Sequence, residues 1–242
     1  MTKAKFDGYA ADYDSWFIAN ENVFLSELKL LKLSLDLAGV AGDGSDSRIL
    51  SVGCGSGLFE KALKDEYGLT VTEGVEPSED MAAIARKRGM EVQIGTAETA
   101  DLPADAYDVI YFNGSSSYIP DLTVAYRNCL DALKSGGKLV LIDVPKESAY
   151  GLMYLLASVQ DGYSSHELEG TMPELPYPIE LAKSAYWHTT EEKIGILTDQ
   201  LGLKNLKYAQ TLVANPVYTN RGVEEPTEGY TKGGYVAIVA EK

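Results

Sequence analysis

The stretch ILSVGCGSGLFEKAL, residues 49–63, indicates the fold of this chain. An apolar run at residues 49–52 is followed by three glycines within five residues and then by a segment with helical patterning. Glycines this closely spaced after a strand allow the backbone to approach a ligand or a neighbouring element. A strand, a glycine-rich loop and a helix in this order predict an open α/β sheet whose ligand lies at the carboxyl ends of the strands.

On both sides of this stretch, strand patterns alternate with helix patterns. The predicted strands are residues 48–53, 70–76, 91–96, 107–113 and 138–144, and the predicted helices are residues 22–37, 56–67, 78–88 and 122–134. Such alternation is typical of right-handed crossovers in a mainly parallel sheet. Thr189 and Glu192 predict a capping box for a further helix that runs to about Leu201. Two strands, near 206–213 and 234–240, are expected to form an antiparallel pair.

Composition limits the classes of function. The chain of 242 residues has 36 acidic and 21 basic residues, a formal net charge of −15. This charge repels phosphate backbones, so we expect no nucleic-acid partner. The apolar runs are too short to span a membrane, and the first residues lack the apolar core of a signal peptide. With two histidines and two cysteines, Cys54 and Cys129, we expect a cytoplasmic protein without a disulfide framework or a metal site.

The spacing of the glycines bears on which ligand is bound. The dinucleotide fingerprint has a third glycine three residues after the second, and here that position is Leu58. The glycines are instead Gly53, Gly55 and Gly57, which weakens the case for a pyrophosphate. Glu76 ends the second predicted strand, where a carboxylate meets ribose hydroxyls in such folds. The alternatives are a purely structural turn at the glycines and a solvated strand-end charge at Glu76.

Five segments in order resemble the successive motifs of one family, the class I S-adenosylmethionine-dependent methyltransferases. These segments are ILSVGCGSG at 49–57, GVEPSEDM at 74–81, GTAETADLP at 95–103, YDVIYFNGSSSYIPD at 107–121 and LKSGGKLVLID at 133–143. Five ordered motifs are more specific than any single one. FDGYAADYDSWF, residues 6–17, is similar to the N-terminal cofactor-covering segment of small-molecule members, including those of quinone biosynthesis.

The resemblance implies an α/β, Rossmann-like fold. Its sheet would be mostly parallel, with seven strands in the order 3-2-1-4-5-7-6, helices on both faces and an inserted lid. We expect residues 1–242 to form a single methyltransferase domain. Its expected parts are an N-terminal helical cover at 1–45, a cofactor-binding core at 46–145, a substrate lid at 146–187, and a C-terminal helix and strand pair at 188–242. The alternative for the Tyr- and Met-rich residues of the lid is ordinary core.

The same resemblance implies S-adenosylmethionine as cofactor and assigns its contacts. The implied cofactor-binding residues are Tyr9, Tyr13, Trp16, Gly53, Cys54, Gly55, Glu76, Pro77, Met81, Ala97, Glu98, Asn113, Gly114 and Tyr118. Residues 53–55 would wrap the methionine part, Glu76 would bind both ribose hydroxyls, and residues 97–98 would meet the adenine edge. The Asn113 carbonyl would accept from the ammonium, and the aromatic residues of segment 9–16 would close over it.

Two positions depart from the family pattern. Members of the family usually have an acidic residue two positions before the first glycine, where this chain has Ser51. Many members also have an Asp at the adenine edge, where this chain has Thr96. Each departure removes a charge-assisted hydrogen bond of about 1.5–3 kcal/mol where such a bond is buried. We therefore expect the cofactor to bind, with modest affinity.

The sequence assigns no catalytic residue, but three residues are candidates for that role: His188, Tyr118 and Asp143. His188 precedes the capping box and is a possible base, although packing on Trp187 is the favoured interpretation. Tyr118 falls where relatives place an aromatic residue or a histidine near the transferred methyl. Asp143 ends the fifth strand, and its alternative role is to cap the next turn. Cys54 is interpreted as a packing residue of the glycine loop and not as a nucleophile.

These features together predict methyl transfer to a small-molecule acceptor by in-line displacement. Such a reaction needs alignment of the reactants and exclusion of water, without a metal or a covalent enzyme intermediate. Two other classes stay open at this point: an NAD-type oxidoreductase and a non-catalytic S-adenosylmethionine-binding protein. The sequence names neither the acceptor nor the oligomeric state.

Overall fold

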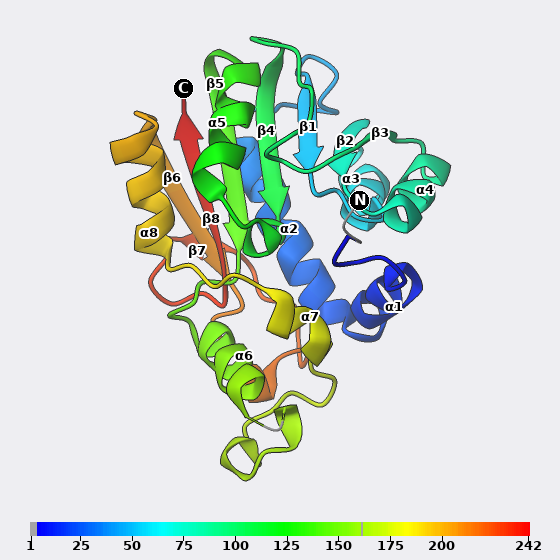
Figure 1. Ribbon diagram of the computed structural model, residues 1–242, viewed down its shortest axis with the longest axis vertical. Coiled ribbons are helices and arrows are strands. Elements are labelled where there is room, and N and C mark those ends of the chain that lie inside the picture. Colours follow the sequence, from blue (N-terminus) through cyan, green and yellow to red (C-terminus); the bar gives the residue numbers. More distant parts are fainter. Residues whose placement is uncertain (1–3, 161) are drawn as a thin grey trace.

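A computed structural model describes residues 4–160 and 162–242 as one mixed sheet with helices on both faces (Figure 1). The strands are β1 Ile49–Val52, β2 Glu73–Glu76, β3 Glu91–Ile94, β4 Tyr107–Asn113, β5 Leu133–Asp143, β6 Lys204–Thr211, β7 Thr227–Glu228 and β8 Tyr235–Glu241. Their order is β3-β2-β1-β4-β5-β8-β6-β7. The α/β class expected from the sequence is confirmed.

The expected strand number and order are wrong in one respect, because the sheet has eight strands and not seven. The additional strand, β7, has two residues and pairs with β6 antiparallel through Ala209 and Gln210. A Thr-Glu pair has no apolar alternation, so no pattern indicated it. The remaining strands follow the expected order, and β8 lies antiparallel between β5 and β6.

Strands β1 to β5 are parallel, which fixes the position of the ligand edge. Ser51 of β1 is in register with Gly74 of β2 on one side and Tyr111 of β4 on the other. The carboxyl ends of these three strands therefore meet at one edge of the sheet. The starts of two strands differ most from expectation: β2 begins at Glu73 and not at residue 70, and β5 begins at Leu133 and not at residue 138.

The helices are α1 Ala10–Ala19, α2 Glu21–Leu37, α3 Leu58–Tyr67, α4 Glu79–Lys87, α5 Leu122–Ala132, α6 Ala149–Val159, α7 Ile179–Ser184 and α8 Thr190–Gly195. Short 3-10 turns are η1 Ser116–Tyr118, η2 Gly162–Ser164, η3 His166–Leu168 and η5 Pro216–Tyr218, and a π-helical turn, η4 Ile196–Gln200, follows α8. In Figure 1, α2 crosses behind the sheet, α5 and α8 lie in front of it, and α6 and α7 extend below it.

Alternate residues of the central strands bury into two cores, one on each face of the sheet. Val109 and Tyr111 of β4 belong to the core under α2, α3 and α6, whereas Ile110 and Phe112 belong to the core under α5 and η4. The apolar stripe of α2 is buried as its periodicity predicted, with Leu28, Leu31 and Leu35 at 0% exposure. Because α2 packs closely against the sheet, its polar residues Ser26, Glu27 and Ser34 are buried as well.

The expected helix boundaries are confirmed where capping residues specify them. The Ser78 hydroxyl accepts from the Met81 amide at 3.4 Å, and Thr189 with Glu192 forms a complete capping box. The helix begun by that box does not stay α-helical to Leu201, because a π turn replaces its last part.

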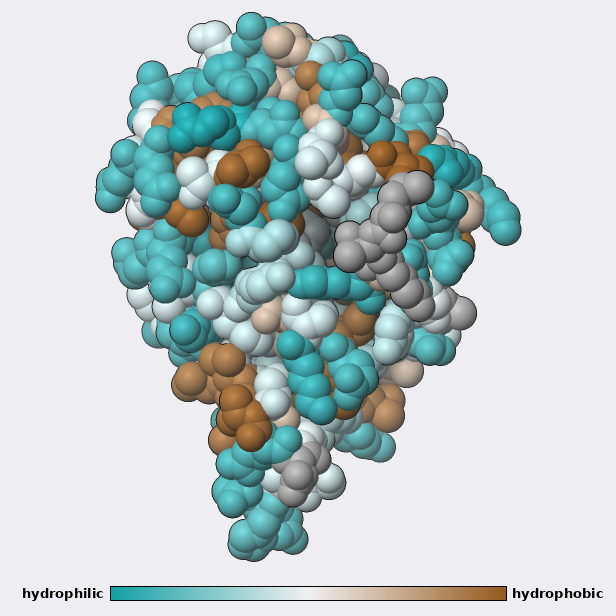
Figure 2. All heavy atoms as spheres, in the orientation of Figure 1, coloured by the Kyte–Doolittle hydropathy of each residue, from teal (hydrophilic) through white to brown (hydrophobic). Residues whose placement is uncertain are grey.

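The insertion after β5 forms α6, two short turns and α7. In Figure 2 most of the visible face is hydrophilic, and apolar residues gather over α6, where Leu152 and Val159 are exposed. Across the described residues, no helix combines the length and hydrophobicity that crossing a membrane requires.

Candidate active site

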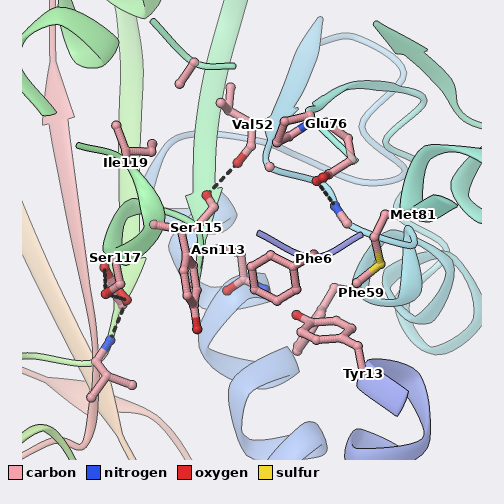
Figure 3. Close-up of a pocket in the computed structure, with 18 of the residues that line it drawn as sticks. Phe6, Tyr13, Val52, Phe59, Glu76, Met81, Asn113, Ser115, Ser117 and Ile119 are labelled. Atoms are coloured by element: carbon pink, nitrogen blue, oxygen red, sulfur yellow. Dashed lines mark hydrogen bonds between the residues drawn. The ribbon is translucent and has the colours of Figure 1, made fainter. Parts of the chain in front are cut away.

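A cavity with about 280 Å³ of space open to water lies at the carboxyl edge of the parallel strands. Twelve of the fourteen expected cofactor residues line it: Tyr13, Trp16, Gly53, Gly55, Glu76, Pro77, Met81, Ala97, Glu98, Asn113, Gly114 and Tyr118. In Figure 3, Glu76 and Met81 lie on one side, Ser117 and Ile119 on the opposite side, and Asn113 between them. The sheet thus brings residues from distant motifs together around one space.

Two expected cofactor residues and one catalytic candidate are absent from the wall of this cavity: Tyr9, Cys54 and His188. Tyr9 is half-buried at the N-terminus of α1. The Cys54 side chain is 8% exposed, and a Cβ on Gly74 would lie 2.7 Å from its sulfur. Burial raises the pKa of the Cys54 thiol well above its usual value, as suits a packing residue and not a nucleophile.

The three glycines of the loop have positive φ but serve different purposes. A Cβ on Gly53 would lie 2.4 Å from Cβ of Ser115, and one on Gly57 would lie 2.8 Å from the sulfur of Met90. A Cβ on Gly55, whose φ is +56°, would meet no protein atom within 4 Å. Gly53 and Gly57 are therefore required for packing, whereas Gly55 borders the open cavity and leaves space for a ligand.

Glu76 is held in the cavity wall by backbone amides. Its Oε2 accepts from the Gly55 amide at 2.9 Å and its Oε1 from the Ser78 amide at 2.8 Å. Burial raises the pKa of Glu76 to about 7, and the two amide hydrogen bonds oppose this rise. Each carboxyl oxygen keeps a further lone pair, so the group can still accept from two hydroxyls of a ligand.

We expect Glu76→Ala to weaken S-adenosylmethionine binding by about 1–3 kcal/mol, the range for hydrogen bonds to a charged group. Because Glu76 also holds the Gly55 amide, part of this loss would come from loosening of the loop. Calorimetry with a 2′,3′-dideoxyribose analogue separates the two parts, since the analogue should lose less affinity than the natural cofactor. Equal losses for both compounds would show that Glu76 does not bind the ribose.

Ser51 occupies the position at which the family usually has an acidic residue, and a buried acid from another element lies beside it. The hydroxyls of Ser51 and Tyr111 both donate to Oε1 of Glu60, each at 2.7 Å. Glu60 comes from α3, is 5% exposed and is absent from the cavity wall. Thr96 does line the cavity, and its hydroxyl pairs with that of Thr99 at 2.9 Å. The carboxyl near β1 thus comes from a helix and not from the strand.

Asp143 lines the cavity, but its carboxylate is already engaged. It accepts from Oγ of Ser117 at 2.9 Å, from the Val144 amide at 2.9 Å and from Nζ of Lys193 at 3.2 Å. The side chains of Asp143 and Lys193 are 4% and 5% exposed. This buried ion pair fixes α8 to the end of β5, and its hydrogen bonds occupy the carboxylate of Asp143.

The other two catalytic candidates differ in position. The Tyr118 hydroxyl donates to that of Tyr177 at 3.3 Å, and burial raises its pKa far above the usual value. His188 lies in a separate surface groove with Glu192, its Nδ1 3.7 Å from a carboxyl oxygen of that residue. Burial lowers the pKa of His188, and Lys193 contributes in the same direction. Tyr118 faces the cavity as an aromatic wall, whereas His188 faces away from it.

The N-terminal segment and the insertion contact each other over the cavity. The indole Nε1 of Trp16 donates to the carbonyls of Leu175 and Pro176 at 3.2 and 3.1 Å, and its ring packs edge-on against Tyr177. Lys5 Nζ donates to the carbonyl of Ser184 at 2.6 Å. These contacts join two chain segments that are more than a hundred residues apart into one cover.

A second set of contacts fixes α1 to the core. Asp14 accepts from the Ser56 hydroxyl at 2.5 Å and from the Arg88 guanidinium at 2.6 Å. The Arg88 guanidinium also donates to the Ser56 carbonyl at 2.8 Å. Because Ser56 belongs to the glycine-rich loop, the position of α1 depends directly on that loop.

Several wall residues were missed by the sequence analysis. They include Phe6, Phe17, Glu27, Phe59, Ser115, Ser117, Trp187 and Tyr235. Most are apolar residues that no pattern distinguishes from ordinary core. Glu27 is the exception, because it lies three residues after Phe24 and one before Leu28, within the apolar stripe of α2. A carboxyl at that position was a readable signal of a buried acid.

Comparisons with known proteins agree with this geometry. Residues 24–206 match a family model described as a methyltransferase domain. An uncharacterised protein of Methanocaldococcus jannaschii is 30% identical over 237 residues, which cover 98% of each chain. The ubiquinone biosynthesis O-methyltransferase of Serratia proteamaculans is 28% identical over 68% of this chain and 71% of its own.

A solved structure is similar over nearly the whole chain. It is a protein of Thermotoga maritima described as an S-adenosylmethionine-dependent methyltransferase and possible histamine N-methyltransferase. The TM-score is 0.79 at 29% identity, and the match covers 98% of both chains. The two proteins therefore share one fold over nearly the whole of both chains.

Proposed function

We propose a function from one premise: this chain belongs to the S-adenosylmethionine-dependent methyltransferase family, whose domain model matches residues 24–206. It is therefore an enzyme that uses S-adenosylmethionine as its methyl donor. The finer proposal is that the acceptor is a small molecule, bound beside the donor in the cavity under α1 and the insertion. The observation that supports it is that one cavity is lined on one side by the residues expected to bind the donor and on the other by aromatic side chains.

The first wall fits the donor. The space in front of Gly55 leaves room for a ligand against the backbone, and Glu76 presents its carboxyl to the same space. Ala97, Glu98 and Asn113 would hold the adenine edge and the ammonium group, as the family resemblance implies. When bound, S-adenosylmethionine supplies an electrophilic methyl group on its sulfonium sulfur. The residues of this wall bind and orient; none of them needs to form a covalent bond.

The second wall fits a small acceptor. It consists largely of aromatic side chains, namely Phe6, Tyr13, Trp16, Phe17, Tyr118, Tyr154, Tyr177, Trp187 and Tyr235. Such walls exclude water and provide apolar area with a few hydroxyls. The cavity volume of about 280 Å³ and the cover over it suit a small molecule and not a folded protein or a nucleic acid. The relatives named above for ubiquinone and histamine methylation support this acceptor class.

The test of this proposal compares donors and acceptors on the purified protein. Calorimetry should show binding of S-adenosylmethionine and of S-adenosylhomocysteine, and no binding of NAD. With methyl-labelled donor, label should transfer to small molecules of a mixed acceptor panel and not to tRNA or DNA. Binding of NAD alone would favour the oxidoreductase alternative. Donor binding without transfer to any acceptor would favour a non-catalytic binding protein.

We expect the cover to depend on the cofactor. Residues 6–20 contact the insertion at 146–187 through Trp16 and the glycine-rich loop through Asp14, so a ligand beneath these contacts should stabilise both segments. Hydrogen exchange measured with and without S-adenosylhomocysteine should show slower exchange in both segments, and little change in α5. Unchanged exchange in both segments would contradict a closing cover.

A further inference from the structure

Among the three buried acids of the cavity wall, Glu27, Glu76 and Asp143, only Glu27 has no partner within the described residues. It projects from α2, is 8% exposed and lines the cavity. Within residues 4–160 and 162–242 it makes no hydrogen bond or ion pair, whereas Glu76 accepts from two amides and Asp143 pairs with Lys193. A buried carboxyl without a partner disfavours folding, so its presence here calls for an explanation by a ligand.

The charges around Glu27 are all negative or neutral. The titratable groups that interact with it are the carboxyl of Asp143 and the hydroxyls of Tyr13, Tyr150, Tyr154, Tyr177 and Tyr235. The wall contains four carboxyls and, among the described residues, no Lys, Arg or His. Burial raises the pKa of Glu27 to about 8, and the charge of Asp143 adds to this effect.

Aromatic rings complete the surroundings. Tyr154 and Trp187 stack at 5.6 Å between ring centroids, and Trp16 meets Tyr177 edge-on at 5.2 Å. The faces of Tyr and Trp attract cations, most strongly where water is excluded. A carboxyl without a partner among such rings is suited to a positively charged group.

From this arrangement we infer that Glu27 anchors the methyl acceptor and that the acceptor is an amine, bound as an ammonium ion. The inference rests on the proposed function and names the acceptor class of the same cavity. A phenol is the main competing class. Loss of its proton would leave an anion that no Lys, Arg or His of the described wall could pair with, whereas an amine that loses its proton becomes neutral.

The reaction balances with Glu27 as proton acceptor. The ammonium passes one proton to the Glu27 carboxylate, and the neutral nitrogen then forms a bond to the methyl carbon. The carbon–sulfur bond breaks, and its electron pair stays on sulfur. The product is a methylated ammonium and S-adenosylhomocysteine, and the proton on Glu27 leaves to water. Burial raises the pKa of Glu27, which brings it closer to the pKa of an amine than that of an ordinary Glu is.

The first experiment measures binding without turnover. With S-adenosylhomocysteine saturating, calorimetry compares 2-phenylethylamine, 2-(indol-3-yl)ethylamine and tetramethylammonium with a neutral isostere of each. At least one cation should bind tenfold or more tightly than its isostere, a preference of the size expected for a buried charge pair. In Glu27→Gln this preference should fall to within about threefold, while affinity for S-adenosylhomocysteine is retained as proof of folding. Absence of any cation preference in the wild type would overturn the inference.

Glu60→Gln is the matched control, because Glu60 is equally buried but absent from the cavity wall. It should keep the cation preference. Calorimetry in buffers of different ionisation enthalpy gives a second readout: at pH 7, amine binding to the wild type should release a proton, and binding to Glu27→Gln should not. Glu60→Gln should release it as the wild type does.

Methyl transfer distinguishes failure of this inference from failure of the proposed function. Transfer to amines that falls at least a hundredfold in Glu27→Gln, with the donor still bound, supports both. Transfer only to phenols, alcohols or thiols keeps the methyltransferase and overturns the amine. No donor binding in the wild type overturns the proposed function itself.

Discussion

Replacing Gly55 by valine is expected to abolish S-adenosylmethionine binding while leaving a folded protein. A Cβ at this position would meet no protein atom within 4 Å, and Gly55 lines the cavity, so we expect the valine to occupy space that the ligand needs. Occupation of that space should lower affinity by a factor on the order of 100 or more, about 3 kcal/mol. Calorimetry measures the affinity, and circular dichroism with thermal unfolding shows whether the fold is retained.

Gly68→Val provides the matched control for backbone strain. Gly68 ends α3 with a φ of +70°, close to the +56° of Gly55, and a Cβ there also meets open space. Both substitutions force a β-branched residue into the left-handed region, at a cost of order 1–3 kcal/mol in stability. Only Gly55→Val should also lose the cofactor. Undiminished affinity in that variant would mean that the loop is merely a turn.

Lys193→Met is expected to destabilise the protein by about 3–5 kcal/mol, because it leaves the buried carboxylate of Asp143 without its cation. The methionine fills a similar volume, so the loss reports charge and not a cavity. Asp143→Asn combined with Lys193→Met should recover most of the stability, since it removes the unpaired charge as well. Urea unfolding at constant pH measures the free energy of unfolding of the wild type, of Lys193→Met and of the double variant.

Lys134→Met tests whether burial causes this effect. Lys134 pairs with Asp108 at 2.7 Å, closer than Lys193 to Asp143, but its side chain is 45% exposed. Water and salt screen such a pair, so its loss should change stability by less than about 1 kcal/mol. Similar losses in both single variants, or no recovery in the double variant, would contradict the assigned role of the buried pair.

The sequence by itself determined the α/β class, the edge of the sheet at which the cavity lies and most of the residues expected to bind the donor. These features depend on local patterns: apolar runs with glycine stops, the Ser78 cap, the Thr189–Glu192 box and the five ordered motifs. Each pattern works over a few residues, through backbone conformations and hydrogen bonds that neighbouring residues specify. For this reason twelve of the fourteen expected cofactor residues line one cavity.

Only the tertiary structure decided which residues line the part of the cavity proposed for the acceptor. The distance along the chain between Glu27 on α2, Asp143 at the end of β5 and Tyr177 in the insertion leaves no spacing rule to relate them. The structure also placed His188 outside the cavity, engaged Asp143 with Lys193 and put the carboxyl of Glu60 beside Ser51, where the family pattern has an acid. The physical reason is that burial and desolvation arise from packing between distant elements, and these determine whether a carboxyl is paired, exposed or left for a ligand.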